Sequence, residues 1–203
     1  DVTVASGLAP LTIKDGGWCT VFADLNNDGL KDLFTASSHA NDRIGEFEAT
    51  TWKQANGVFV NEGGGRFRAA RVEAGLDGAV AVHRGCGVAD LNADGRLDLV
   101  VLTLGSNVEL WENASSPAPH WLVVRLVGTR SNRDGIGARV TVGTQLRTMT
   151  TALGYASSSH AGLHFGLGTA TEVPLIEVQW PSGTVQRIER VQADQVVTIT
   201  ETS

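Results

Sequence analysis

Hydrophobic residues in this chain gather in short runs that alternate with polar residues, and Gly, Asn and Asp separate the runs. Residues 121–127 and 176–180 show this alternation. A period of two residues is the period of an extended strand with one buried face. The 24 glycines and the recurrent valine, threonine and leucine agree with this pattern. The sequence therefore predicts an all-β protein built from short strands.

The first half of the chain contains an internal repeat of about 66 residues, counted from Asp24 to Asp90. In each copy a short β-prone run enters a polar loop and another leaves it. The hairpin pattern of residues 57–67 returns in shortened form at 107–113. Four short strands at this period are typical of a β-propeller blade, whose faces are buried only against neighbouring blades. We therefore expect residues 1–116 to hold the tail of one blade, one full repeat and one shortened repeat.

Two blades cannot close a ring, so we expect an incomplete propeller and regard the chain as the C-terminal part of a longer protein. The absence of an initiating Met agrees with this expectation. Residues 36–54 depart from the compact blade pattern. This insertion is either a tolerated surface loop or a functional one.

A short linker with two prolines, residues 114–119, leads into a second region of strands. Alternation in this region predicts an antiparallel β-sandwich over residues 117–203. Pro181, Ser182 and Gly183 predict a turn after one of its strands. The expected strands are 120–127, 138–142, 146–151, 173–180, 185–188 and 195–200.

The size and composition of the chain are those of a globular protein. With 203 residues and 42% hydrophobic content it can bury a core. No apolar run approaches the ~18 residues of a membrane-spanning helix, and no signal-type segment begins the chain. We expect no insertion into a membrane.

The two cysteines, Cys19 and Cys86, precede the two polar loops but are one register apart when the repeats are aligned. Strand alternation then points them to opposite faces of their strands. A disulfide between them is open but not favoured, and we expect two small buried residues instead.

The two polar loops share the pattern D-x-N-x-D-G-x-x-D, at residues 24–32 and 90–98. Oxygen-bearing side chains at positions 1, 3 and 5, a glycine at 6 and a carboxylate at 9 suit a hard cation such as calcium. A solvated Asp/Asn/Gly turn would use the same residue types, but two matching copies favour two Ca²⁺ sites. The expected ligands are the side chains at positions 1, 3, 5 and 9 and the carbonyl at position 7: Asp24, Asn26, Asp28, Asp32 and Leu30, then Asp90, Asn92, Asp94, Asp98 and Arg96.

These loops differ from EF-hands, which place a bidentate Glu at position 12 between helices. Position 12 is Thr35 in the first loop and Val101 in the second, and β-prone runs flank both loops. Each loop is therefore expected to join two strands. The six loop aspartates account locally for the formal charge of −6. A nucleic-acid partner is not expected.

The loops and several later motifs carry a family resemblance. The loops resemble the FG-GAP or VCBS repeats of integrin-α-like propellers. The second region is similar to the ASPIC/UnbV domain, which occurs with such repeats in secreted cartilage acidic protein and its bacterial relatives. The matching sequence motifs are residues 132–140, 154–155, 164–168 and 180–183. The resemblance covers nearly the whole chain. It implies a calcium-stabilised, extracellular or periplasmic protein, and it supplies no ligand.

Other candidate chemistry is sparse. His160 and His164 would lie ~13 Å apart on an extended segment, too far to share a zinc ion. We expect His164 in a structural turn, with its imidazole against a backbone carbonyl. Asp134 is either part of a third metal site or the side chain that holds a tight loop, and we prefer the loop. No G-x-S-x-G nucleophile elbow occurs.

The sequence thus favours a calcium-stabilised extracellular protein that binds an unknown protein or carbohydrate ligand and is not an enzyme. The alternative is a propeller-based enzyme. Its site would be formed by the insertion at 36–54, with His39 and Asp42, and by His83 nearby. A deep pocket that gathers these groups would favour the enzyme.

Overall fold

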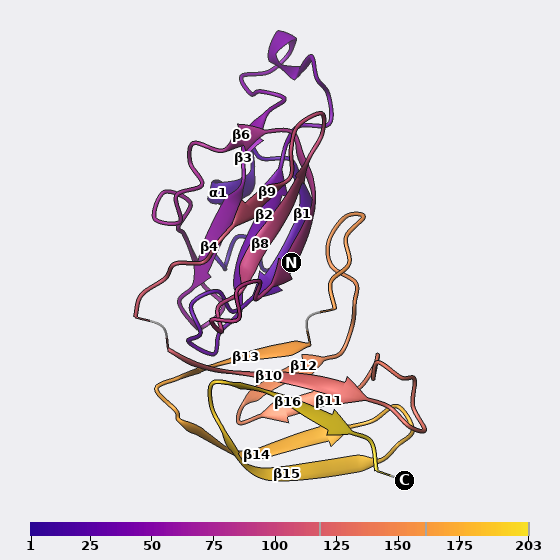
Figure 1. Ribbon diagram of the computed structural model, residues 1–203. Coiled ribbons are helices and arrows are strands. Elements are labelled where there is room, and N and C mark those ends of the chain that lie inside the picture. Colours follow the sequence, from indigo (N-terminus) through magenta and orange to yellow (C-terminus); the bar gives the residue numbers. More distant parts are fainter. Residues whose placement is uncertain (118, 161, 203) are drawn as a thin grey trace.

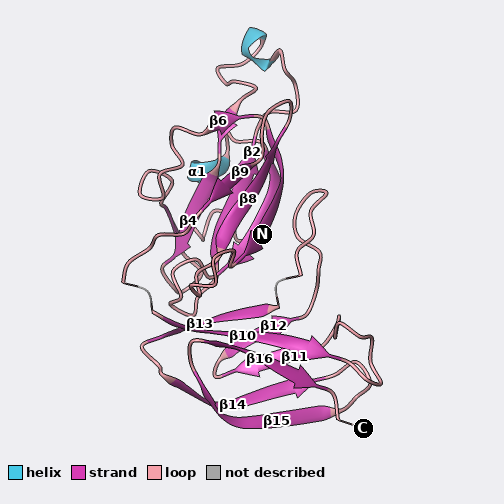
Figure 2. Ribbon diagram, viewed as in Figure 1, coloured by secondary structure: helices cyan, strands magenta, loops and turns pink. Residues whose placement is uncertain are grey.

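The computed structural model describes residues 1–117, 119–160 and 162–202, and its regular secondary structure is almost wholly β-strand (Figure 1, Figure 2). The helical segments in these ranges are α1 (Ala9–Thr12) and the single 3-10 turn η1 (Ile44–Glu46). Neither these nor any other helix of the described chain is long and apolar enough to cross a membrane. The predicted all-β class is confirmed. Of the predicted linker, position 118 lies outside the described residues.

The first repeat forms a four-stranded antiparallel sheet in the order β1-β2-β4-β5. Its strands are β1 (Gly17–Ala23), β2 (Asp32–Ser37), β4 (Gly57–Asn61) and β5 (Phe67–Ala69). Strands β1 and β2 flank the first polar loop, and β4 and β5 form the expected hairpin. The insertion leaves the sheet after β2 and carries η1.

The second repeat forms a three-stranded antiparallel sheet in the order β7-β8-β9. Its strands are β7 (His83–Ala89), β8 (Asp98–Thr103) and β9 (Glu109–Trp111), and β7 and β8 flank the second loop. A fourth strand is missing from this sheet in the described chain, because the chain leaves toward the linker after β9. The two-residue strands β3 (Gln54–Ala55) and β6 (Val80–Ala81) pair with each other beside the two sheets.

The two sheets stack on each other over one apolar core. Its main members are Val21, Phe34 and Val58 from the first sheet and Val88, Leu99 and Val101 from the second. A disulfide joins Cys19 to Cys86 across this core, with their Cα atoms 5.7 Å apart. The expectation of two unpaired cysteines is therefore wrong. Stacked sheets meet through opposite faces, so residues that point to opposite faces of equivalent strands are the ones that come together.

The C-terminal domain contains two further sheets, in the orders β13-β10-β16 and β12-β11-β14-β15, packed over a second apolar core. The strands are β10 (His120–Val127), β11 (Arg139–Val142), β12 (Gln145–Thr148), β13 (Leu163–Gly168), β14 (Glu172–Gln179), β15 (Val185–Gln192) and β16 (Gln195–Thr200). All pairings are antiparallel except that of β10 with β16, which is parallel and differs from the expected pattern. The turn after β14 is confirmed, since the Gly183 N–H donates to the Trp180 carbonyl at 2.9 Å.

One loop of the C-terminal domain, residues 149–160, reaches up beside β1 (orange in Figure 1). Tyr155 donates its N–H to the Trp18 carbonyl at 3.3 Å, and Cys86 donates its N–H to the Ser157 hydroxyl at 2.9 Å. Gly154 lies directly on the backbone of Cys19. The loop therefore covers the disulfide and contacts both stacked sheets.

Candidate metal centre

The first polar loop is folded around its own aspartates. Asp24 accepts hydrogen bonds from the N–H groups of Asp28 at 3.1 Å and of Gly29 at 2.8 Å. Asp28 accepts one from the N–H of Leu30 at 2.8 Å. Asn27 and Gly29 have φ angles of 57° and 92°, a left-handed conformation that Asn and Gly tolerate best. The Asx residues and the glycine thus set the path of the loop.

The second loop repeats this geometry almost bond for bond. Asp90 accepts the N–H of Asp94 at 3.1 Å and that of Gly95 at 2.8 Å. Asp94 accepts the N–H of Arg96 at 2.9 Å, and the φ angles of Ala93 and Gly95 are 62° and 84°. The two loops are therefore structurally equivalent.

The position-9 aspartates tie each loop to the end of the third strand of its sheet or to the segment just after it. Asp32 accepts the N–H groups of Leu25 and Asn61, both at 2.9 Å. Asp98 makes the equivalent bonds to Leu91 and Asn113, both at 2.8 Å. Asp32 and Asp98 are buried, with 1% and 2% of their surface exposed.

Negative charge is concentrated in dry surroundings at the first loop. Burial is the main cause that raises the pKa of Asp24, to about 6; repulsion by Asp28 and Asp32 adds to it, while the Gly29 N–H and the more distant Arg147 guanidinium lower it. Burial also raises the pKa of Asp32. A cation at this loop would relieve the cost of holding these carboxylates ionised.

The donor chemistry of the loops fits a hard cation, but the side chains do not form a closed shell. In the described part of the chain no three His, Cys, Asp or Glu side chains converge closely enough to hold a metal ion. The loop oxygens instead accept amide hydrogen bonds, and Asn26 donates its Nδ2 to Asp28 at 2.9 Å. In the second loop Arg96 contacts Asp94 directly. Ion binding would require these side chains to turn toward a common centre.

The two loops touch each other and the C-terminal domain, in part through residues outside the ligand positions of the motif. Asn27 donates its Nδ2 to the Gly95 carbonyl at 3.1 Å, and His164 directs its Nε2 to the same oxygen at 3.1 Å. Asn113 donates its Nδ2 to the Leu25 carbonyl at 2.7 Å. Asn27 is at position 4 of the motif, where the pattern allows any residue. The one sequence signal that could have identified it as important is the tolerance of asparagine for a positive φ angle.

The histidines lie apart from one another. His83 is buried, with Nδ1 3.0 Å from the Ser37 carbonyl and Nε2 3.1 Å from the Glu109 carboxylate. His164 lies on β13 rather than in a turn, although the expected contact of its imidazole with a carbonyl is present. His160 forms no metal cluster with it within the described ranges.

The insertion lines part of a cleft of about 360 Å³, to which it contributes His39 and Glu48 opposite residues such as Asp15. Asp42 and His83 do not line it. The grouping of His39, Asp42 and His83 that would favour the enzyme alternative is therefore not formed.

The loop around Asp134 is held by Asn132, whose Oδ1 accepts the Ile136 N–H at 2.8 Å. Asp134 itself pairs with Arg133 at 3.0 Å on the surface. The expectation that the Asp side chain holds this loop is wrong, because the neighbouring Asn makes the hydrogen bonds to the backbone.

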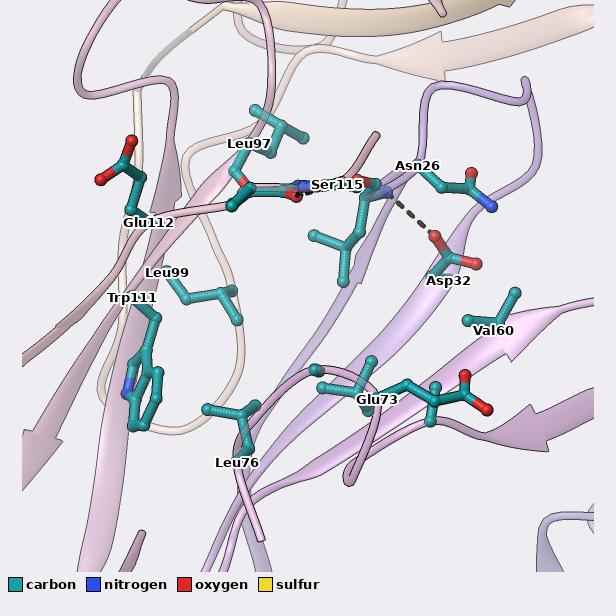
Figure 3. Close-up of a pocket in the computed structure, with 16 residues that line it drawn as sticks. Asn26, Asp32, Val60, Glu73, Leu76, Leu97, Leu99, Trp111, Glu112 and Ser115 are labelled. Atoms are coloured by element: carbon teal, nitrogen blue, oxygen red, sulfur yellow. Dashed lines mark hydrogen bonds between the residues drawn. The ribbon is translucent and has the colours of Figure 1, made fainter. Parts of the chain in front are cut away.

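A larger cavity of about 380 Å³ opens between the two stacked sheets (Figure 3). Val60 lies on one wall, Leu99 and Trp111 lie on the other, and Leu76 lies at one end. The first loop contributes Asp32 to its rim. No histidine occurs among the described residues that line it, and most of its wall is apolar core.

Two family models match the chain. The model described as "FG-GAP-like repeat" matches residues 24–101, and the model described as "ASPIC and UnbV" matches residues 128–203. The first match begins at the first residue of the first loop and includes both loops. No curated protein matches the chain.

Proposed function

The chain joins an FG-GAP-like repeat to an ASPIC and UnbV domain, an architecture that fits an extracellular binding or adhesion protein, and we propose that calcium stabilises it and that it acts without catalysis. The observation that carries this proposal is the pair of equivalent loops. In both loops, aspartates at equivalent positions of the motif accept equivalent backbone hydrogen bonds, and both loops join two strands of a sheet. A cation bound in such a loop would hold a turn between strands in place.

The first ion would be held by Asp24, Asn26, Asp28, Asp32 and the Leu30 carbonyl, and the second by Asp90, Asn92, Asp94, Asp98 and the Arg96 carbonyl. Calcium would supply only charge neutralisation and a fixed geometry. The hydrogen bonds now made by the loop oxygens support this assignment, because they already orient the backbone around the carboxylates. The burial of Asp32 and Asp98 supports it further, since an ion would compensate their charge.

We also propose that the protein is extracellular or periplasmic. The Cys19–Cys86 disulfide supports this location, because such bonds persist in oxidising compartments and are rare in the cytosol. Both cysteines are almost fully buried. A buried bridge between two sheets is a structural disulfide rather than a reactive thiol pair.

The partner would be a protein or a carbohydrate, and an aromatic surface beside the disulfide is the best candidate face for it. The rings of Trp18 and Tyr155 lie 4.9 Å apart, edge to face, and Arg84 lies 4.0 Å over the Trp18 ring. Tyr155 keeps 54% of its surface exposed. Aromatic residues and arginine are enriched in binding surfaces.

Thermal unfolding in calcium and in chelator tests the calcium proposal. An ion that binds only the folded state adds about 2.7 kcal/mol per site to the free energy of unfolding at a free concentration of 100 Kd. Chelator should therefore lower the melting temperature of the unmutated protein. Asp28→Ala and Asp94→Ala should lower it in calcium and leave less for chelator to remove. Asp42→Ala, in the insertion, is the matched control and should respond to chelator like the unmutated protein. An unchanged melting temperature of the unmutated protein in chelator refutes the proposal.

A further inference from the structure

The C-terminal domain rests directly on the backbone of the two loops. Gly168, at the end of β13, donates its N–H to the Asn27 carbonyl at 2.9 Å. His164, on the same strand, directs its Nε2 to the Gly95 carbonyl at 3.1 Å. Asn27 also donates its Nδ2 to the Pro119 carbonyl at 3.3 Å. One strand of the domain therefore contacts both loops, and the loop residues involved lie between the expected ion ligands.

The fit at this contact is close at two glycines, Gly166 and Gly95. A Cβ atom on Gly166 would overlap the Asp24 carboxylate and the backbone of Asn27. A Cβ atom on Gly95 would overlap the indole of Trp121, on β10. A change in the path of either loop would therefore push against the domain.

Side chains of β12 also hold β13 in place at this contact. Gln145 donates its Nε2 to the Gly166 carbonyl at 2.6 Å, and Arg147 donates to the Gln145 side chain at 2.8 Å. A Cβ atom on Gly29 would lie 3.3 Å from the Gln145 Nε2. The backbone of β13 is thus held between β12 and the first loop.

We propose that ion occupancy of the two loops and docking of the C-terminal domain are thermodynamically linked. An ion fixes the loop backbone whose carbonyls, at Asn27 and Gly95, receive the domain, so it strengthens docking. By reciprocity, docking raises the affinity of the loops for the ion by the same factor. The inference rests on the proposed function in one respect, that the loops bind calcium.

Amide hydrogen exchange of the full chain, followed by NMR in calcium and in chelator, tests this linkage in the unmutated protein. The N–H groups of Asp28 and Gly29 report ion binding, and that of Gly168 reports docking. The Gly183 N–H, bonded within the C-terminal domain, is the internal control. We expect calcium to slow exchange at Gly168 by about tenfold, within the usual range of coupling factors, and to leave Gly183 unchanged.

A matched pair of histidine variants tests the reciprocal effect. His164→Ala removes the contact with the Gly95 carbonyl, whereas His120→Ala removes a surface pair with Asp194 inside the same domain. We expect His164→Ala to weaken calcium binding, measured by calorimetry, by about fivefold and to speed exchange at Gly168. His120→Ala should do neither.

The outcomes separate the linkage from the calcium proposal. If calcium protects Asp28 and Gly29 while exchange at Gly168 stays the same, the loops bind calcium and the linkage is refuted. If calcium protects none of these amides, the proposed function fails and the linkage fails with it. Should His164→Ala fail to fold, the measurement on the unmutated protein still decides.

Discussion

Asn27 in the first loop donates its side-chain amide to the carbonyl of Gly95 in the second loop at 3.1 Å. The contact joins equivalent turns of two repeats, because stacked sheets bring their connecting loops side by side. Both residues have positive φ angles, 57° and 84°. The left-handed conformation of the loops therefore serves the contact between repeats as well as the path of each loop.

Gly95→Ala tests how tightly the second loop is packed against the C-terminal domain. Positive φ alone costs a non-glycine residue about 1–2 kcal/mol. At Gly95 the new methyl group would also overlap the Trp121 indole, so the loss should be clearly larger. Gly105→Ala is the matched control, because Gly105 has a φ of +70° and open space around it. Chemical denaturation measures both, and equal losses would contradict the packing at Trp121.

The disulfide should contribute a large share of the stability of the stacked sheets. Cys19 and Cys86 are separated by 67 residues, and closing a loop of that size stabilises a fold by roughly 4 kcal/mol in the chain-entropy model. A reductant strong enough to open the buried bond should lower the melting temperature. The double variant Cys19→Ala/Cys86→Ala should have a lower melting temperature than the unmutated protein, and reductant should not change it. A reductant effect in the double variant would show that the loss has another cause.

His83 should be a structural residue. Its two ring nitrogens face the Ser37 carbonyl and the Glu109 carboxylate, and the side chain is fully buried. His83→Ala leaves a cavity and two acceptors without their partner, so we expect a loss of about 2 kcal/mol or more in the free energy of unfolding. His39→Ala, on the insertion, should change it little. A mild effect of His83→Ala in chemical denaturation would contradict this role.

Glu201 should make the C-terminal domain sensitive to acid. Burial raises the pKa of its carboxyl, but the N–H groups of Ser131, Arg130 and Thr129 and the Ser182 hydroxyl outweigh burial and lower the pKa to about 2, from an ordinary value of 4.5. A folded-state pKa below the unfolded value stabilises the fold above the unfolded pKa. This contribution should therefore be complete above pH 4.5 and be lost as the pH falls toward 2.

Unfolding of the Glu201→Gln variant as a function of pH checks this prediction. Its free energy of unfolding should be lower than that of the unmutated protein at neutral pH, and the difference should shrink as the pH falls from about 4.5 toward 2. Glu189→Gln, on β15, is the matched control and should run parallel to the unmutated protein. A constant difference between Glu201→Gln and the unmutated protein down to pH 2 would contradict the role of the carboxylate.

Much of the fold is readable from local pattern because strands and turns are local. The alternation over residues 120–127 and 195–200 predicts β10 and β16 with the bounds that the structure has. β13 was missed as a strand, because Gly166 and Gly168 in a short glycine-rich run suggest a turn. Gly166 is required by close contact with the first loop, because a Cβ atom there would overlap the Asp24 carboxylate. The local sequence pattern does not reveal this contact.

The position of the expected ion ligands within each loop is likewise a local property. The aspartates of the motif accept hydrogen bonds from backbone N–H groups no more than seven residues away, and the exception is the second bond made by Asp32 and by Asp98. The repeated pattern therefore predicts most of the loop geometry. What the loops touch is not local. Asn27, Gly95 and His164 meet only because three segments of the chain are brought together.

The sequence by itself determined the all-β class, the two repeats, the two equivalent loops and most strands of the C-terminal domain, since each depends on residues close together in the chain. The tertiary structure decided the Cys19–Cys86 disulfide, the parallel pairing of β10 with β16 and the docking of β13 on the loops. These features depend on which faces and edges meet after the sheets stack. Alternation assigns each side chain to a face of its own strand, and only packing decides which other face lies against it.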